Sequence, residues 1–213
     1  MFVPIRSLTP VLILGLFLFA TTILLSLSQA AKSANDASAK RATTAAGLAA
    51  WDQVYAVLIS PRCINCHTAT NYPQQGDDRH RHFANIVRGP EGKGVPGLNC
   101  ISCHQDHNAD STGVPGGHDW HLAPLSMQWQ DVNDRPMSSA AVCRAVTDRS
   151  KNENMDGPAL LKHHAEAELV LWAWNPGRRP DGTMRTLPPI SHQEFVVATR
   201  TWVEAGTPCP KGR

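Results

Sequence analysis

The chain carries one pentapeptide twice, as Cys63-Ile64-Asn65-Cys66-His67 and as Cys100-Ile101-Ser102-Cys103-His104. The pattern C-x-x-C-H attaches c-type haem: its two thiols form thioether bonds to the porphyrin, and its histidine becomes an axial ligand of the iron. The sequence therefore predicts two covalently bound haem c groups. The thioether residues are Cys63, Cys66, Cys100 and Cys103, and the proximal iron ligands are His67 and His104.

Two other kinds of site also use paired cysteines. A zinc site could take both C-x-x-C pairs as four thiolate ligands, but it would leave the two trailing histidines without a role. A thioredoxin-like dithiol requires a strand-turn-helix frame around its C-x-x-C, and neither motif has that frame. Haem attachment gives every cysteine and histidine of both motifs a function.

The first 30 residues have the pattern of an export signal. Arg6 forms a short basic region, residues 11–25 are an almost unbroken apolar run, and Ser28-Gln29-Ala30 offers the small residues that a signal peptidase reads. We expect cleavage after Ala30, and the alternative is an uncleaved N-terminal anchor, which would be the chain's only contact with a membrane. Either outcome places the remaining residues in the periplasm, where bacteria attach c-type haem.

The rest of the chain divides into a short leader and one haem-bearing region. Residues 31–45 are rich in Ala, Ser and Lys, and we expect a flexible leader there. Residues 46–213 are then the dihaem domain, built either as one compact domain or as two small haem lobes.

Composition argues against two classes of partner. Among 213 residues, 20 are Lys or Arg and 18 are Asp or Glu, so the formal net charge is +2. Two haems would add carboxylates, and nothing therefore points to a nucleic acid or an anionic lipid surface as partner. The 16 Pro and 15 Gly residues indicate a chain with many loops.

The hydrophobic pattern predicts a mainly α fold with long irregular loops. Helices are expected over residues 46–59, which end before Pro61, and over residues 138–146 and 157–174. A last helix should begin at the capping box of Ser191 and Glu194 and end at Gly206. Residues 68–99 show little periodicity and are expected to form a loop around the first haem, with sharp turns over residues 89–94.

The sixth iron ligand of the first haem is expected from the loop that follows its motif. In Arg79-His80-Arg81-His82-Phe83, His82 is the first choice and His80 the second. The alternative is a solvated basic cluster, because arginines flank both histidines.

The second haem has candidates of two kinds. Met127 lies in a proline-bounded apolar loop, and methionine is a common sixth ligand, although most methionines simply fill gaps in a core. His163 and His164 are rival distal ligands from a helix, and a buried histidine bonded to the backbone is their ordinary alternative.

Two cysteines remain outside the motifs, Cys143 and Cys209. In an oxidising compartment such a pair is expected to form a disulfide, which would stabilise the fold by about 2–5 kcal/mol. Two buried free thiols are the alternative.

A resemblance to known proteins agrees with the motifs. A helix followed by C-x-x-C-H resembles the opening of class I cytochrome c domains, and the region after the export signal resembles the small dihaem c-type cytochromes of bacteria. One subgroup, often labelled as a subunit of isoquinoline 1-oxidoreductase, is similar in four stretches. These are Gln74-Gln75-Gly76-Asp77-Asp78, Arg88-Gly89-Pro90, Leu122-Ala123-Pro124 with Met127 and Trp129, and Leu169-Val170 with Trp172, Trp174, Pro176 and Gly177.

The motifs and the resemblance together imply a periplasmic electron-transfer protein rather than an enzyme. Its two haems would pass single electrons from a donor dehydrogenase to an acceptor cytochrome or oxidase, and the subgroup label implies that the donor is a molybdenum hydroxylase. The alternatives are a dihaem enzyme of the peroxidase type and a haem sensor. Both alternatives require one open coordination position on an iron.

Overall fold

The computed structural model describes residues 9–212, apart from the side chains of residues 9–28, 30, 31 and 34. The chain separates into two units, Met1–Thr43 and Thr44–Arg213. The expected export signal, residues 1–30, falls almost entirely on residues whose side chains lie outside this description. No helix in the described part of the chain is both long and apolar enough to cross a bilayer.

The first unit is described as one helical segment, the beginning of α1 (Thr9–Leu58). Residues 31–45, for which the sequence predicts a flexible leader, are helical throughout. The difference has a local cause, because Ala and Lys have high helix propensity and this stretch holds no proline or glycine.

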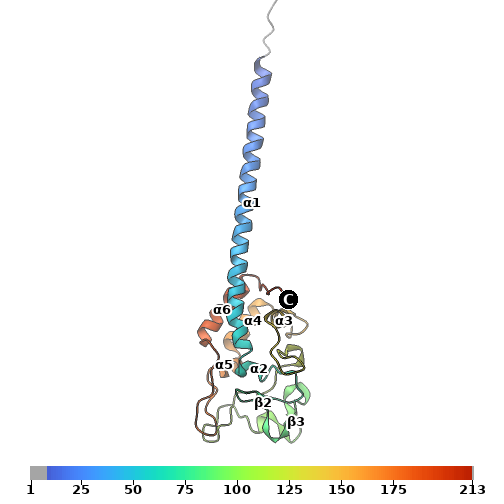
Figure 1. The fold of residues 1–213 in the computed structure, drawn as a ribbon, viewed down its shortest axis with the longest axis vertical. Coiled ribbons are helices and arrows are strands. Elements are labelled where there is room, and N and C mark those ends of the chain that lie inside the picture. Colours follow the sequence, from blue (N-terminus) through green and yellow to red (C-terminus); the bar gives the residue numbers. More distant parts are fainter. Residues whose placement is uncertain (1–8, 213) are drawn as a thin grey trace, which may run out of the picture. The chain divides into compact units, whose positions relative to one another are not determined.

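The second unit contains the end of α1 and every later element, so that both C-x-x-C-H motifs lie in one compact unit. It is mainly helical, as the sequence predicts, and its strands have only two residues each. The longer elements after α1 are α2 (Pro61–Ile64), α3 (Ser139–Thr147), α4 (Gly157–Glu166), α5 (Glu168–Trp172) and α6 (His192–Glu204). Figure 1 shows α3, α4 and α6 beside the end of α1.

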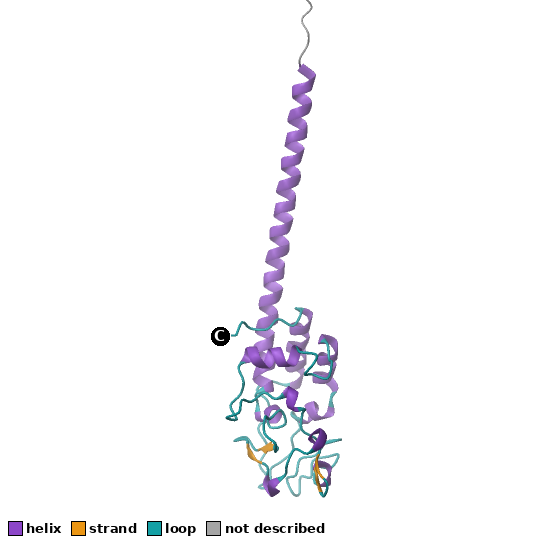
Figure 2. Cartoon of the chain, turned by 90° about the vertical axis from the view of Figure 1, so that its right-hand side faces the viewer, coloured by secondary structure: helices purple, strands orange, loops and turns teal. Residues whose placement is uncertain are grey.

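Two short antiparallel hairpins lie between α2 and the second motif. β1 (Gln74–Gln75) pairs with β2 (His80–Arg81), and β3 (Gly94–Val95) pairs with β4 (Leu98–Asn99). Figure 1 places β2 and β3 at the end of the unit away from α3, and Figure 2 shows the strands gathered at one end of the unit. Four single-turn 3-10 helices complete this region: η1 (Phe83–Asn85), η2 (Pro90–Gly92), η3 (Cys100–Ser102) and η4 (Leu125–Met127).

The predicted sharp turn over residues 89–94 is present. Gly89 has a φ of 63°, and a Cβ atom at this position would lie 1.8 Å from the carbonyl oxygen of Gly94. Only glycine fits this conformation and this close approach. The turn is followed by β3 and β4, and the second motif begins directly after β4.

The hydrophobic core lies where the end of α1 meets α3, α4 and α6. Trp51 and Trp202 are fully buried, and their ring centroids are 4.8 Å apart. The indole nitrogen of Trp51 donates to the Ser139 hydroxyl at 2.8 Å, which satisfies its polar atom in the core. The core extends through Ile64 of α2 to Trp129, and so it supports the first motif directly.

The last helix matches its sequence signals. Ser191 caps α6 through a hydrogen bond from the Glu194 amide, and the Glu194 carboxylate accepts from the Ser191 amide, which completes the predicted capping box. Gly206 follows the helix with a φ of 82°. Four residues that recur at helical spacing along α6 are all buried: Phe195, Ala198, Thr199 and Trp202.

The helix predicted over residues 157–174 is interrupted. α4 ends at Glu166, Ala167 adopts an extended backbone with ψ of 128°, and α5 follows. The break lets Trp172 reach Asn108, whose side-chain oxygen accepts a hydrogen bond from the indole nitrogen at 3.0 Å. A long-range contact has therefore overridden local helix propensity.

The structure joins Cys143 of α3 to Cys209 of the C-terminal tail by a disulfide. Their Cα atoms are 5.6 Å apart, within the usual range for such bonds. The bond links segments separated by 66 residues, and Cys143 itself belongs to the core.

Candidate functional site

The first motif histidine is held from its Nδ1 side. His67 Nδ1 donates to the carbonyl oxygen of Met127 at 2.7 Å, and the amide of Trp129 donates to the His67 carbonyl at 2.9 Å. The ring of Trp129 stacks on the imidazole with centroids 3.5 Å apart and planes 3° apart. The segment from η4 to Trp129 thus fixes both the position and the rotation of the His67 ring.

The second motif histidine is held in the same way by a different segment. His104 Nδ1 donates to the carbonyl oxygen of Pro115 at 2.7 Å, and Trp120 stacks on the ring at 4.7 Å with planes 8° apart. Gly116 permits this placement, since a Cβ atom there would lie 2.1 Å from the His107 carbonyl oxygen.

Each ring therefore carries its proton on Nδ1 and leaves the Nε2 lone pair available, the tautomer that a metal-ligating histidine needs. Among the described residues, neither Nε2 has a hydrogen-bond partner. Burial lowers the pKa of His67 to about 3 and also lowers the pKa of His104, so both rings are neutral at pH 7.

The four motif cysteines are unpaired thiols. Burial raises the pKa of Cys63 to about 12 and of Cys66 to about 11, and it raises the pKa of Cys100 as well. A redox dithiol needs the opposite, because its reactive form is the thiolate. A thioether carries no charge and suits the partly buried positions of Cys63, Cys66 and Cys100.

A zinc site is not formed by the described residues. Nowhere in the described part of the chain do three or more His, Cys, Asp or Glu side chains gather as a metal site. The two motifs nevertheless lie close together, since Cys66 of the first and Cys103 of the second line one cavity.

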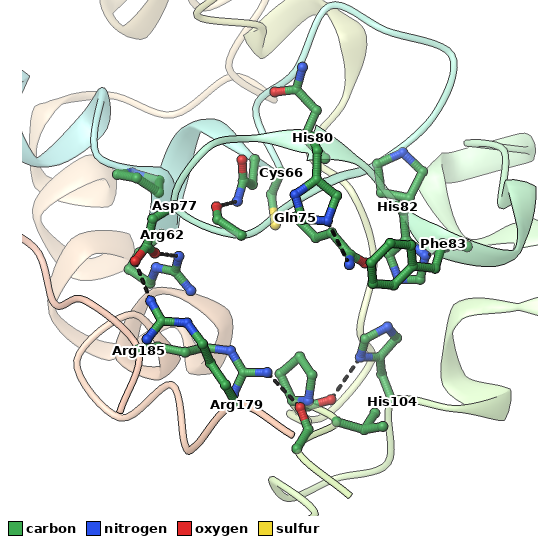
Figure 3. A pocket seen from close by; sticks show the side chains of 18 of the residues that line it. Arg62, Cys66, Gln75, Asp77, His80, His82, Phe83, His104, Arg179 and Arg185 are labelled. Carbon is green, nitrogen blue, oxygen red and sulfur yellow. Dashed lines mark hydrogen bonds and ion pairs between the residues drawn. The ribbon is translucent and has the colours of Figure 1, made fainter. Parts of the chain in front are cut away.

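A cavity of about 680 Å³ opens between the motifs, and its volume is in the range of sites that bind cofactors. Cys66 of the first motif and Cys103 and His104 of the second line it. Figure 3 shows Cys66, His82 and His104 around one open space, with Arg62, Arg179 and Arg185 on its other side.

On one wall of the cavity, two arginines form ion pairs with the carboxylate of Asp77. Asp77 accepts from Arg62 at 2.5 Å and also binds Arg179, while Arg185 bonds to backbone carbonyls that include Gly113 O at 2.5 Å. Three guanidinium groups thus share this wall with Asp77. Burial lowers the pKa of Arg62, and its Nε–H is buried with no partner among the described atoms.

These features fit haem c. Cys66, Cys100, Cys103 and His104 line the two described cavities and match the covalent and iron bonds of haem c, whereas Cys63 and His67 line neither cavity. The propionate carboxylates of a haem suit the excess of guanidinium groups and the unpartnered Arg62 N–H. The buried indole N–H of Trp129, which also lacks a partner in the described structure, is a further donor beside His67.

His80 and His82, the two candidate sixth ligands near the first hairpin, differ in whether a ring nitrogen is free. His80 uses both ring nitrogens, with Nδ1 at 2.6 Å from Asp78 and Nε2 at 3.0 Å from Gln75. His82 lies beside His104, with ring centroids 5.8 Å apart. The sequence assigned His82 to the first haem, but the structure brings it to the second motif.

The structure does not bring Met127 to the second motif. Met127 is only 6% exposed, belongs to the hydrophobic core and presents its backbone carbonyl to His67. It lines neither of the two described cavities beside His104. Its position matches the gap-filling role that the sequence leaves open.

The α4 histidines line neither of the cavities that His104 lines. Their ring centroids are 5.9 Å apart, and the His164 ring lies 4.7 Å from the ring of Phe195 in α6. His164 is 5% exposed, and its Nδ1 lies 3.0 Å from the Thr199 hydroxyl. The ring nitrogens of His163 have no hydrogen bond within the described part of the chain.

Several residues of the site were not singled out from the sequence. Arg62, Arg179 and Arg185 are separated along the chain, and no local pattern predicts that they share a wall. Pro115 contributes only a carbonyl oxygen. Only Arg62 could have been associated with the site from the sequence, because it directly precedes Cys63 of the first motif in α2.

Comparison of the chain with protein-family models, curated proteins and solved structures finds no match. The site is therefore interpreted from its own residues.

Proposed function

We propose that this protein is a periplasmic dihaem c-type cytochrome that transfers single electrons. The observation that carries the proposal is the shared environment of the two motif histidines. Each donates its Nδ1–H to a backbone carbonyl at 2.7 Å, stacks on a tryptophan and keeps Nε2 free. A structural histidine has no need for a free Nε2, whereas an axial ligand requires it.

When bound, haem c supplies a one-electron centre whose potential depends on ligands, charge and burial. The chain's residues set those conditions. His67 and His104 are proposed proximal ligands, and the cysteines of the two motifs hold the porphyrins. Trp129 and Trp120 cover the imidazoles, and the arginine wall provides cations for carboxylates.

The proposed partners are redox proteins, a donor dehydrogenase and an acceptor cytochrome or oxidase. A donor of the molybdenum hydroxylase class is the specific form that the sequence resemblance suggests. No acid–base step is required of the protein, because an electron relay moves electrons without making or breaking bonds in a substrate.

The test is to count haems and to probe their coordination in the same sample. Protein expressed with a c-type haem maturation system should carry two covalently bound haems per chain by mass spectrometry. Carbon monoxide should leave the visible spectrum of the dithionite-reduced protein unchanged, because both irons are filled. A chain without covalent haem would overturn the proposal, and binding at one haem would favour the peroxidase or sensor function.

A control separates attachment from folding. By mass spectrometry, Cys103→Ala should either lack the second haem or hold it by a single thioether bond through Cys100. Cys143→Ala, which changes a cysteine outside the motifs, should retain both haems. Equal haem content in the wild type and in Cys103→Ala with Cys100→Ala would contradict attachment at this motif.

A further inference from the structure

His82 and His104 come from different parts of the chain and meet at the same place. His82 follows β2, and His104 ends the second motif. Both line the large cavity and also the neighbouring cavity of about 110 Å³. The two imidazoles therefore lie at the border of the two cavities, which offer space for a planar group such as a porphyrin.

The two imidazoles have the same tautomer. His82 Nδ1 donates to the carbonyl oxygen of Phe83 at 2.8 Å, as His104 Nδ1 donates to Pro115. No described atom bonds to Nε2 of His82. Both rings thus offer a free Nε2 lone pair.

Their separation suits one metal ion between them. A bond from imidazole nitrogen to a metal such as zinc is about 2.0–2.1 Å long, so two nitrogens on opposite sides of one ion lie about 4 Å apart. Because each ring centre lies about 1 Å beyond its nitrogen, two imidazoles on opposite sides of one ion have ring centres about 6 Å apart. The observed centroid distance is 5.8 Å. The ring planes differ by 71°, which axial ligation permits.

The neighbouring candidates are less suited. His80 has both nitrogens engaged, by Asp78 and Gln75. Met127 lies in the core. His121 lines only the smaller of the two cavities, and no ring contact with His104 is found among the described residues.

We infer that His82 is the sixth ligand of the haem attached at Cys100 and Cys103, opposite His104. This inference rests on the proposed function and specifies the coordination at one of its two sites. Bis-histidine ligation places the reduction potential of that haem below the potential of a histidine–methionine haem.

The experiment uses three variants of the full chain, His82→Ala, His82→Met and His80→Ala. After reduction, His82→Ala should bind carbon monoxide at one of its two haems. The wild type and His80→Ala should bind none. His82→Met should raise the potential of one haem and add the charge-transfer band of a methionine-ligated ferric haem.

A background with one haem identifies which site responds. In a chain carrying Cys63→Ala and Cys66→Ala, only the second motif can be loaded, and His82→Ala should open that single haem to carbon monoxide. In the reciprocal chain with Cys100→Ala and Cys103→Ala, the same substitution should leave the spectrum unchanged.

The outcomes separate the inference from the proposed function. A wild type with two haems and a His82→Ala variant that binds no carbon monoxide would overturn the ligand assignment alone. Loss of the haem from both His82→Ala and His82→Met, with His80→Ala fully loaded, would assign His82 a structural role. A wild type without covalent haem would overturn both proposals.

Discussion

One backbone carbonyl decides the chemical form of each motif histidine. The carbonyl on His67 belongs to a residue 60 positions away, and the carbonyl on His104 to a residue 11 positions away. The C-x-x-C-H pattern predicts which imidazoles are ligands, because that relation is covalent and local. It contains no information on the carbonyl that orients each ring, which depends on how distant loops pack.

The two α4 histidines show the same limit at single residues. The sequence leaves His163 and His164 open as distal ligands, and the structure makes them unequal. His164 faces inward and bonds to Thr199, whereas the His163 ring has no hydrogen bond in the described structure. His163 is therefore the more available ligand of the two.

Replacing each α4 histidine by alanine should produce different effects. If His163 is a sixth ligand, His163→Ala should open one haem to carbon monoxide in the reduced protein, because the imidazole without a hydrogen bond in the described structure is removed. His164→Ala should leave coordination unchanged and lower the free energy of unfolding by about 1–3 kcal/mol, since Thr199 loses its buried partner. Carbon monoxide titration and denaturant unfolding measure the two quantities. Carbon monoxide binding by His164→Ala alone would reverse the assignment.

At the scale of elements, α6 is the part most fully determined by neighbouring residues. Its capping box, its buried face and the glycine after its end all follow from the residues of the helix itself. The break between α4 and α5 could not be predicted in this way. It depends on the contact of Trp172 with Asn108, which lies 64 residues earlier.

Ser191→Ala should lower the free energy of unfolding by about 1 kcal/mol, because α6 loses its cap. Gln193→Ala, an exposed position in the first turn, is the matched control and should change stability by less than about 0.5 kcal/mol. Denaturant unfolding at pH 7 checks both values, and equal stability of the two variants would contradict a capping role.

The same cap also predicts a dependence on pH. Hydrogen bonds from the Ser191 side chain and amide lower the pKa of Glu194. Stability from these bonds is present above the unfolded-state pKa and is lost as pH falls through the folded-state pKa. The stability of the wild type should therefore approach that of Ser191→Ala on acidification, as unfolding curves over a pH series would show.

At the scale of the whole second unit, Arg88 ties three loops together. Its guanidinium donates to the carbonyls of Thr68, Thr70 and Ala123 at 2.8, 3.2 and 2.6 Å. These bonds connect the segment after the first motif with the segment before η4, which in turn orients His67. A buried arginine thus holds in place the loops on which the site depends.

Arg88→Met should destabilise the protein by about 2–4 kcal/mol, because three carbonyls lose a charged donor while the cost of burying the charge is relieved. The exposed Arg149 serves as a control, and Arg149→Met should be within about 0.5 kcal/mol of the wild type. Chemical denaturation of the haem-loaded proteins measures the difference. A neutral Arg88→Met would show that the loops hold without this side chain.

The disulfide acts on the whole unit by joining α3 to the C-terminal tail. Replacing both Cys143 and Cys209 by alanine should lower the free energy of unfolding by about 2–5 kcal/mol while leaving two haems attached. Alkylation of the unfolded, unreduced wild type followed by mass spectrometry should label neither cysteine. Labelling of both would instead support the alternative of two free thiols.

By itself the sequence determined the mainly helical class and the capped last helix, and it predicts the attachment residues, since each follows from adjacent residues or from the period of a helix. Only the tertiary structure decided which histidine faces which motif. In the structure, His82 lies beside His104 rather than beside the first motif, and Met127 lies in the core. Three arginines that are distant in the sequence line one cavity. The physical reason is that these relations arise from loops that pack across long separations, where side-chain contacts rather than local periodicity select the conformation.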